Sequence, residues 1–205
     1  MLAGAALSLP LAACGGGTRQ DASEPSGNFN VDLMAARFPA NQSLSQHVHL
    51  IITVHNADSR TIPDIAVTIT AGDIGTQAQA FAETLNMPGL ASSSRPVWIV
   101  DRGPGPCAYS CRNGGPGSAV TAYSNTWALG ALKPGAVATF DWAVTAVKAG
   151  VHVVRYSVAA GLNGKAKAQL AGGQPPRGSF RVTIHNTPAQ SYVTDQGQIV
   201  TLPPR

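Results

Sequence analysis

The sequence predicts an all-β protein with an antiparallel β-sandwich fold, and three observations support this prediction. Apolar and polar residues alternate with a period of two in several short segments, as half-buried strands require. The 205-residue chain contains 22 Gly and 15 Pro, which favour frequent tight turns. No window of a dozen residues has an amphipathic helical period. Residues 76–86 come nearest, and we expect a short helix or turn there.

Successive segments of the chain carry the strand pattern. In HVHLIITVHN one face is apolar and the other carries three histidines, as in a strand with one solvated side. Residues after Val193 contain an Asp-Gln-Gly turn between two short apolar runs, which predicts a hairpin. The segments that we expect to form strands are 47–56, 65–69, 139–144, 151–162, 180–184 and the two halves of 191–202.

The first residues have the features of an export signal. An apolar run from Leu2 to Leu11 has the length of a signal-peptide core, about ten residues, and is shorter than the roughly 20 residues of a membrane span. The sequence Leu11-Ala12-Ala13-Cys14 resembles a bacterial lipobox. The resemblance implies that a signal peptide, residues 1–13, is removed and that Cys14 receives a diacylglyceryl lipid anchor. Met1 is followed directly by apolar residues, without the Lys or Arg that usually begins a signal peptide. An ordinary secretory signal and a buried first strand are the alternatives.

Residues 14–29 are expected to form a flexible, disordered tether, because their Gly, Ser, Asp, Glu and Pro residues cannot bury apolar surface. The folded domain is then expected at residues 30–205. With the anchor, the protein would be a palmitate-bearing lipoprotein of the cell membrane. Its domain would face the extracytoplasmic side.

The assignment of Cys14 to a lipid leaves Cys107 and Cys111 as a pair. Export to an oxidising compartment favours a disulfide between them, closing a small loop. The alternatives are half of a zinc site, which would need two more ligands, and a redox pair, which more usually has two intervening residues.

Two longer segments resemble bacterial immunoglobulin-like (Ig-like) modules of the CARDB kind. The first is LIITVHNADSRTIPDIAVTI, and the second is WALGALKPGAVATFDWAVTAVKAGVHVVRYSVAAGL. Together they place the resemblance at residues 44–71 and 127–162, and it implies an Ig-like sandwich. Residues 72–126 do not fit such a module and are interpreted as a loop-rich insertion that carries the cysteine pair.

Several residues are candidates for binding chemistry. His47 and His49 lie on one strand face with Cα atoms about 6.6 Å apart, so they could ligate one metal ion. His55 lies on the same face, about 26 Å further along. Solvated surface histidines are the favoured interpretation, and the sequence predicts no metal site. Trp98 and Trp127 could line a groove in the 95–127 segment, but burial in the core is the preferred interpretation.

The formal net charge of +4 is spread along the chain with no local basic patch, so we expect no nucleic-acid partner. The sequence contains neither a G-x-S-x-G nor an H-E-x-x-H motif. We therefore expect a non-enzymatic, cofactor-free envelope protein that contacts another envelope protein or a polysaccharide. The alternative is an extracytoplasmic ligand- or metal-binding lipoprotein that uses residues 95–127 or the pair His47 and His49.

Overall fold

The computed structural model describes residues 23–71, 80–82, 96–105, 119, 121, 125–188 and 190–202. They form thirteen strands and no helix, so this part of the chain has no helix able to cross a membrane. The strands are β1 (Gly27–Arg37), β2 (Asn41–Leu44), β3 (His47–Asn56), β4 (Ala66–Ala71), β5 (Phe81–Ala82), β6 (Trp98–Arg102), β7 (Thr126–Ala128), β8 (Val137–Ala146), β9 (Gly150–Ala159), β10 (Ala166–Gln169), β11 (Arg177–Pro188), β12 (Ser191–Val193) and β13 (Ile199–Thr201).

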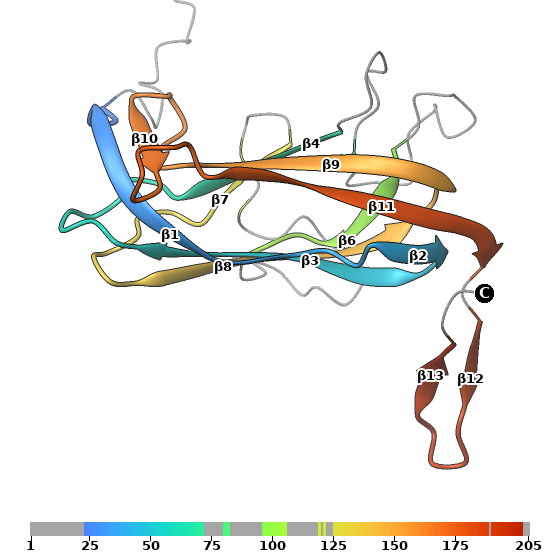
Figure 1. The fold of residues 1–205 in the computed structure, drawn as a ribbon. Coiled ribbons are helices and arrows are strands. Elements are labelled where there is room, and N and C mark those ends of the chain that lie inside the picture. Colours follow the sequence, from blue (N-terminus) through green and yellow to red (C-terminus); the bar gives the residue numbers. More distant parts are fainter. Residues whose placement is uncertain are drawn as a thin grey trace, which may run out of the picture.

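Two sheets pack face to face, which confirms the predicted sandwich (Figure 1). One sheet has six strands in the order β10-β1-β3-β8-β6-β5, and the other has five in the order β2-β11-β9-β4-β7. The strands alternate between buried and more exposed residues, as the period-two pattern predicts. In β3 the buried residues include Val48, Leu50, Ile52 and Val54, and the residues between them are exposed or half-buried. Each sheet therefore buries one face and leaves the other available for contacts.

The core between the sheets is rich in aromatic rings. Trp127 meets Trp142 edge to face, with ring centroids 5.4 Å apart, and Trp142 stacks on Phe140 at 5.7 Å. Trp98 and Trp127 are both buried, as predicted from the sequence. Aromatic side chains bury large apolar areas, so these rings contribute much of the stability of the sandwich.

The sheets are mixed rather than purely antiparallel. β10 pairs with β1, β2 pairs with β11, and β5 pairs with β6, each in parallel. The long central pairings, such as β3 with β8 and β9 with β11, are antiparallel as predicted. The parallel pairs lie at the sheet edges, where the short strands β10, β5 and β2 each pair with a strand that is not linked to them by a hairpin.

The expected tether at residues 14–29 is too long at its C-terminal end. β1 begins at Gly27, and Phe29 is buried. The Glu24 carboxylate accepts hydrogen bonds from the backbone N–H groups of Asn163 and Ala166, both at 2.7 Å. Two charge-assisted hydrogen bonds and a buried ring hold this segment on the domain, so the described part of the domain includes residues from Glu24 onward.

The segment 72–126, interpreted as an insertion, supplies strands to both sheets. β5 and β6 extend the six-stranded sheet beyond β8, and β7 begins at Thr126 and pairs with β4. Phe81 and Ala82, for which we expected a short helix or turn, form β5 because they pair with Trp98 and Ile99. Residues 72–79, 83–95, 106–118, 120 and 122–124 of the segment, which include both cysteines, lie outside the described residues.

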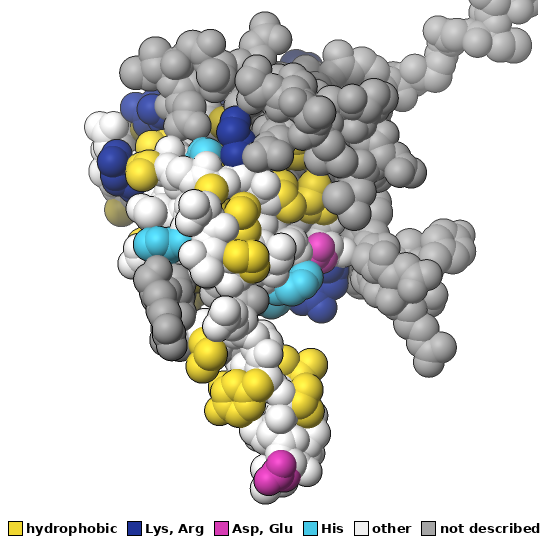
Figure 2. All heavy atoms as spheres, turned by 90° about the vertical axis from the view of Figure 1, so that its right-hand side faces the viewer, with side chains coloured by type: hydrophobic (Ala, Val, Ile, Leu, Met, Phe, Trp, Pro, Cys, Tyr) yellow, Lys and Arg dark blue, Asp and Glu magenta, His cyan; other side chains and the backbone are white. Residues whose placement is uncertain are grey.

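The predicted C-terminal hairpin is present and projects from the end of the sandwich (Figure 1). β12 and β13 pair only with each other among the described strands. Their apolar side chains are exposed, with Ile199 at 74% and Val193 at 65%, and they are visible in Figure 2. A two-stranded hairpin that pairs with neither sheet of the sandwich is marginally stable by itself.

The loop after β3 fastens the start of β1. The Asp58 carboxylate accepts hydrogen bonds from the backbone N–H groups of Asn30 at 3.1 Å and Arg60 at 3.0 Å, and from the Arg60 guanidinium. The guanidinium also donates to the Asn28 carbonyl and lies 4.4 Å from the centre of the Phe29 ring. The hydrogen bond from Arg60, followed by the one from Asn30, lowers the pKa of Asp58 well below its usual range.

This lowered pKa predicts an acid-dependent loss of stability. The contribution of Asp58 is fully present above the unfolded-state pKa of about 3.9 and is lost as the pH falls toward the lower folded-state pKa. We expect Asp58→Asn to reduce the free energy of unfolding by about 1 to 2 kcal/mol at pH 7. Urea unfolding at pH 7 and pH 3 should show this difference shrinking in acid. Asp195→Asn, at the exposed hairpin tip, is the control, and a pH-independent difference for Asp58→Asn would contradict the assignment.

Candidate functional site

The outer face of the six-stranded sheet carries a row of histidine–aspartate pairs. His47, His49 and His55 project from it, since the alternate residues of β3 are buried. Each histidine has an aspartate partner on another strand of the same sheet. We call this surface the His–Asp face. It consists of Asp32, His47, His49, His55, Asp101, Arg102, Asp141 and Thr145.

The group around His47 has the chemical components of a catalytic triad but not its geometry. His47 Nδ1 lies 3.0 Å from Asp101 Oδ2 and 2.9 Å from Thr145 Oγ1, and the Thr145 hydroxyl donates to Asp101 at 2.6 Å. A relay that activates a hydroxyl needs the carboxylate and the hydroxyl on opposite ring nitrogens. Here both lie at Nδ1, so His47 is not placed to take a proton from Thr145.

The other two pairs are also hydrogen-bonded across strands. His49 Nδ1 lies 2.7 Å from Asp141 Oδ1, and the second oxygen of Asp141 lies 3.5 Å from the Arg102 guanidinium. His55 Nδ1 lies 3.0 Å from Asp32 Oδ2. All three pairs are partly exposed, so each adds little to stability by itself. Together they make an ordered polar strip across β1, β3, β8 and β6.

His47 and His49 were the candidate metal ligands, and each is hydrogen-bonded to a different carboxylate. An ionised carboxylate only accepts hydrogen bonds, so Nδ1 of each ring is the donor and Nε2 is the nitrogen left for a ligand. Nowhere in the part of the chain that the structure describes do three or more His, Cys, Asp or Glu residues gather as a metal site. The arrangement there is a set of histidine–aspartate hydrogen bonds.

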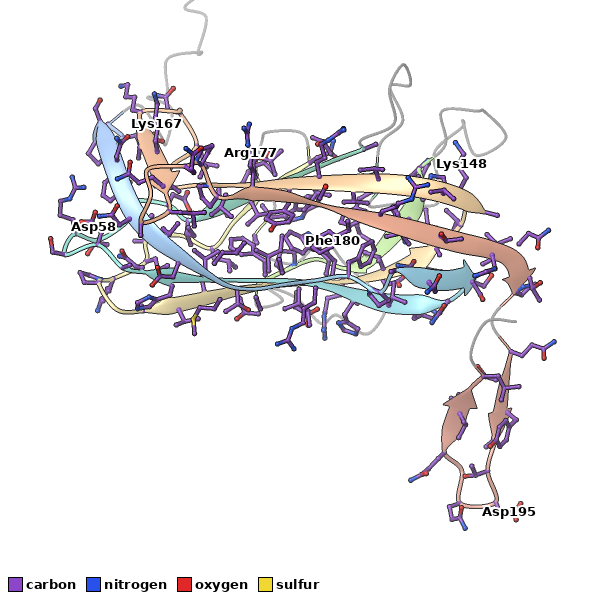
Figure 3. All side chains as sticks on the ribbon, viewed as in Figure 1. Asp58, Lys148, Lys167, Arg177, Phe180 and Asp195 are labelled. Atoms are coloured by element: carbon purple, nitrogen blue, oxygen red, sulfur yellow. The ribbon has the colours of Figure 1, made fainter. Side chains whose placement is uncertain are left out.

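The outer face of the five-stranded sheet has a different character. We call it the Arg–hydroxyl face, and it consists of Thr68, Thr70, Thr126, Arg155, Ser157, Arg177, Ser179 and Arg181. The strand register places these side chains in rows, because Arg177 is opposite Ser157, and Arg155 is opposite both Ser179 and Thr70. Hydroxyls thus separate the guanidinium groups. Figure 3 shows Arg177 outside the layer, whereas Phe180 points between the sheets.

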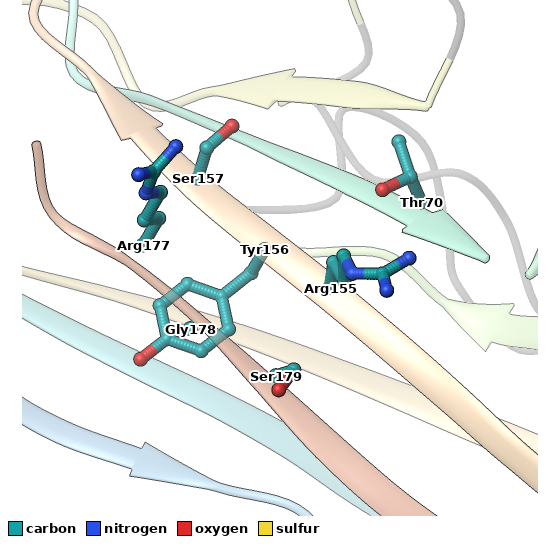
Figure 4. A pocket seen from close by; sticks show the side chains of 7 residues that line it. All are labelled: Thr70, Arg155, Tyr156, Ser157, Arg177, Gly178 and Ser179. Carbon is teal, nitrogen blue, oxygen red and sulfur yellow. The ribbon is translucent and has the colours of Figure 1, made fainter. Parts of the chain in front are cut away.

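A shallow hollow of about 520 Å³ lies in this face, with Arg155 and Arg177 on either side of it (Figure 4). Its floor depends on Gly178, because a Cβ at this position would lie 2.5 Å from the Tyr156 hydroxyl oxygen. The Tyr156 ring stacks on Phe180, with centroids 5.4 Å apart, and burial raises the pKa of its hydroxyl. The hollow therefore lies over the packed Tyr156 ring and has guanidinium and hydroxyl groups at its rim.

The sequence-predicted site residues divide into three groups. Cys14, Cys107 and Cys111 lie outside the described residues, so the lipid anchor and the disulfide stay predictions. His47 and His49 lie on a solvated face, as expected, but their aspartate partners were not foreseen. The Arg–hydroxyl face was not predicted from the sequence. The signal that could have revealed it is the alternation of Arg and Ser at outward positions of β9 and β11.

No protein-family model and no curated protein sequence matches the chain. Among solved structures, the fold is similar to the CARDB domain of a Pyrococcus furiosus protein in complex with di-metal ions, with a TM-score of 0.41 and 9% identity over 78% of this chain and 94% of that one. It is also similar to part of Escherichia coli alpha-2-macroglobulin, with a TM-score of 0.40 and 13% identity over 79% of this chain and 7% of that one.

A third similar structure is a beta-glucosidase from Listeria innocua in complex with glucose, with a TM-score of 0.39 and 13% identity over 78% of this chain and 16% of that one. The chain thus spans a small part of the macroglobulin and of the glucosidase. Similarity at these identities concerns the Ig-like sandwich fold alone.

Proposed function

We propose that the chain is a non-enzymatic, lipid-anchored protein of the bacterial cell envelope, and that its Ig-like sandwich mediates contact with an envelope protein or polymer. The observation that carries this proposal is the chemistry of the two outer faces. Both display ordered polar groups on paired strands, histidine–aspartate pairs on one sheet and arginines with hydroxyls on the other. Rigid strands hold such groups at fixed spacing, which favours recognition of an extended partner.

The anchor is supported by the sequence Leu11-Ala12-Ala13-Cys14 and by the length of chain that follows it. Nine residues lie between Cys14 and Glu24, whose carboxylate is hydrogen-bonded to the sandwich. A fully extended chain of that length reaches about 35 Å. A lipid on Cys14 would therefore keep the domain close to the membrane surface, and two acyl chains would anchor it stably.

The anchor is tested by Cys14→Ala in a bacterial host that processes lipoproteins. We expect this variant to lose incorporation of radiolabelled palmitate and to move from the detergent phase to the aqueous phase, because the acylated thiol is gone. Cys111→Ala is the matched control and should keep both the label and the detergent partitioning. Retention of the label by Cys14→Ala would contradict the proposed anchor.

A further inference from the structure

The carboxylate side chains of the sandwich strands all lie in the six-stranded sheet, which also contains Arg37 and Arg102. The five-stranded sheet has three arginines, and none of its strands contains Asp or Glu. The strands of the six-stranded sheet contain Asp32, Asp101 and Asp141. The chain has only 14 basic and 10 acidic residues in total, so this separation makes one outer face distinctly positive.

The three arginines lie in a zigzag across two neighbouring strands. Arg155 on β9 is opposite Ser179 on β11, and Arg177 and Arg181 lie two positions to either side of that serine. Diagonal neighbours of this kind are about 7 to 8 Å apart. The three arginines therefore lie along one zigzag line with hydroxyl residues between them, and the backbone positions at its two ends on β11 are about 13 Å apart.

The donors along this line suit phosphate groups. A guanidinium presents a planar fork that binds phosphate oxygens through two parallel hydrogen bonds. Arg177 and Arg181 form no ion pair with a carboxylate of the described chain. The hydroxyls of Thr70, Ser157 and Ser179 add neutral donors at the hollow between Arg155 and Arg177.

From these observations we infer that the Arg–hydroxyl face binds a phosphate-bearing anionic polymer of the envelope, an inference that rests on the proposed function. The open, shallow hollow suits a repeating chain that crosses the strands more than one enclosed ion. A polymer also places successive anionic groups on successive arginines. Nucleic acid is disfavoured because β4, β9 and β11 present no Phe, Tyr or Trp on this outer face for base stacking.

The test measures binding of inorganic polyphosphate to the full chain carrying Cys14→Ala, so that no lipid contributes. We expect Arg177→Gln and Arg181→Gln each to weaken binding about threefold at low salt, and the triple variant with Arg155→Gln to weaken it about thirtyfold. Higher ionic strength should weaken wild-type binding and shrink these differences. The single variants keep the test valid if the triple variant is unstable.

The matched control is Arg37→Gln, an exposed strand arginine of the six-stranded sheet that lowers the net charge equally. It should leave polyphosphate binding unchanged. An equal loss in this control would overturn the inference, because net charge alone would then explain binding. Unchanged binding by the triple variant would also overturn it, as would tighter binding to an oligonucleotide or to phosphatidylglycerol vesicles. The anchor experiment depends on Cys14 alone, so the two proposals fail separately.

Discussion

Trp98→Ala is expected to lower the free energy of unfolding by about 3 to 5 kcal/mol, the largest effect that we predict for one substitution. Trp98 is fully buried in β6, and its ring lies 5.2 Å from Phe38 and 6.1 Å from Phe81, centroid to centroid. Removal of the indole leaves a cavity where side chains from several strands meet. A loss of this size is a large share of the 5 to 15 kcal/mol that typically stabilises a domain.

The indole also makes a polar connection between the two sheets. Trp98 Nε1 donates to Gln42 Oε1 at 2.7 Å, and the fully buried Gln42 belongs to β2 of the five-stranded sheet. Trp98→Phe keeps an aromatic ring but leaves Gln42 Oε1 without its hydrogen-bond donor. We therefore expect an intermediate loss of about 1 to 3 kcal/mol in the free energy of unfolding.

Chemical unfolding monitored by circular dichroism measures both Trp98 variants. Tyr192→Ala on the exposed hairpin serves as the aromatic control and should cost less than about 0.5 kcal/mol. A Trp98→Ala variant that is as stable as this control would show that the ring does not hold the core.

Asn56→Ala is expected to cost about 3 kcal/mol because it removes a buried amide that joins two loops. Asn56 is fully buried, and its Nδ2 donates to the carbonyls of Leu132 at 2.8 Å and Arg60 at 3.0 Å. Its Oδ1 accepts the backbone N–H of Asp58 at 2.9 Å. The substitution therefore removes the partner of the Arg60 carbonyl and of the Asp58 N–H, and it removes one of the two hydrogen bonds of the Leu132 carbonyl, which keeps the one from the Ile62 N–H.

The same unfolding measurement, with Asn28→Ala as an exposed strand control, tests this role. Asn56→Asp separates the two functions of the side chain, because it keeps the acceptor for the Asp58 N–H but loses the donor to both carbonyls. We expect Asn56→Asp to be nearly as destabilising as Asn56→Ala, since it also introduces a charge at a buried position. A cost for Asn56→Ala no larger than that of Asn28→Ala would refute the assignment.

The arrangement of the domain bears on the proposed anchoring. β1 begins at one end of the sandwich, and the β12–β13 hairpin leaves the opposite end (Figure 1). With a lipid on Cys14, the hairpin would lie at the end of the domain opposite the attachment of the tether. The Arg–hydroxyl face would run along the side of the domain, where a polymer can reach it without crossing the lipid surface.

The period-two pattern was sufficient to predict the long central strands. The apolar face of β3 is buried as expected, and β4, β8, β9 and β11 occupy the predicted segments. β1, β2 and β10 were missed. Phe29 and Val31 alternate with polar residues, but the polar stretch before them indicated a tether. The long-range bonds of Glu24 to Asn163 and Ala166 have no local signal in the sequence, so the start of the domain could not be predicted.

By itself the sequence determined the sandwich class, the buried faces of its long strands and the turn between β12 and β13, because the alternation of side chains along a strand is a local property. Only the tertiary structure decided which strands are neighbours. That order brought Asp101 and Asp141 to the histidines of β3, and it placed Arg155 diagonally between Arg177 and Arg181. Both surfaces join residues far apart in the chain, whose proximity depends on strand order and register rather than on local pattern.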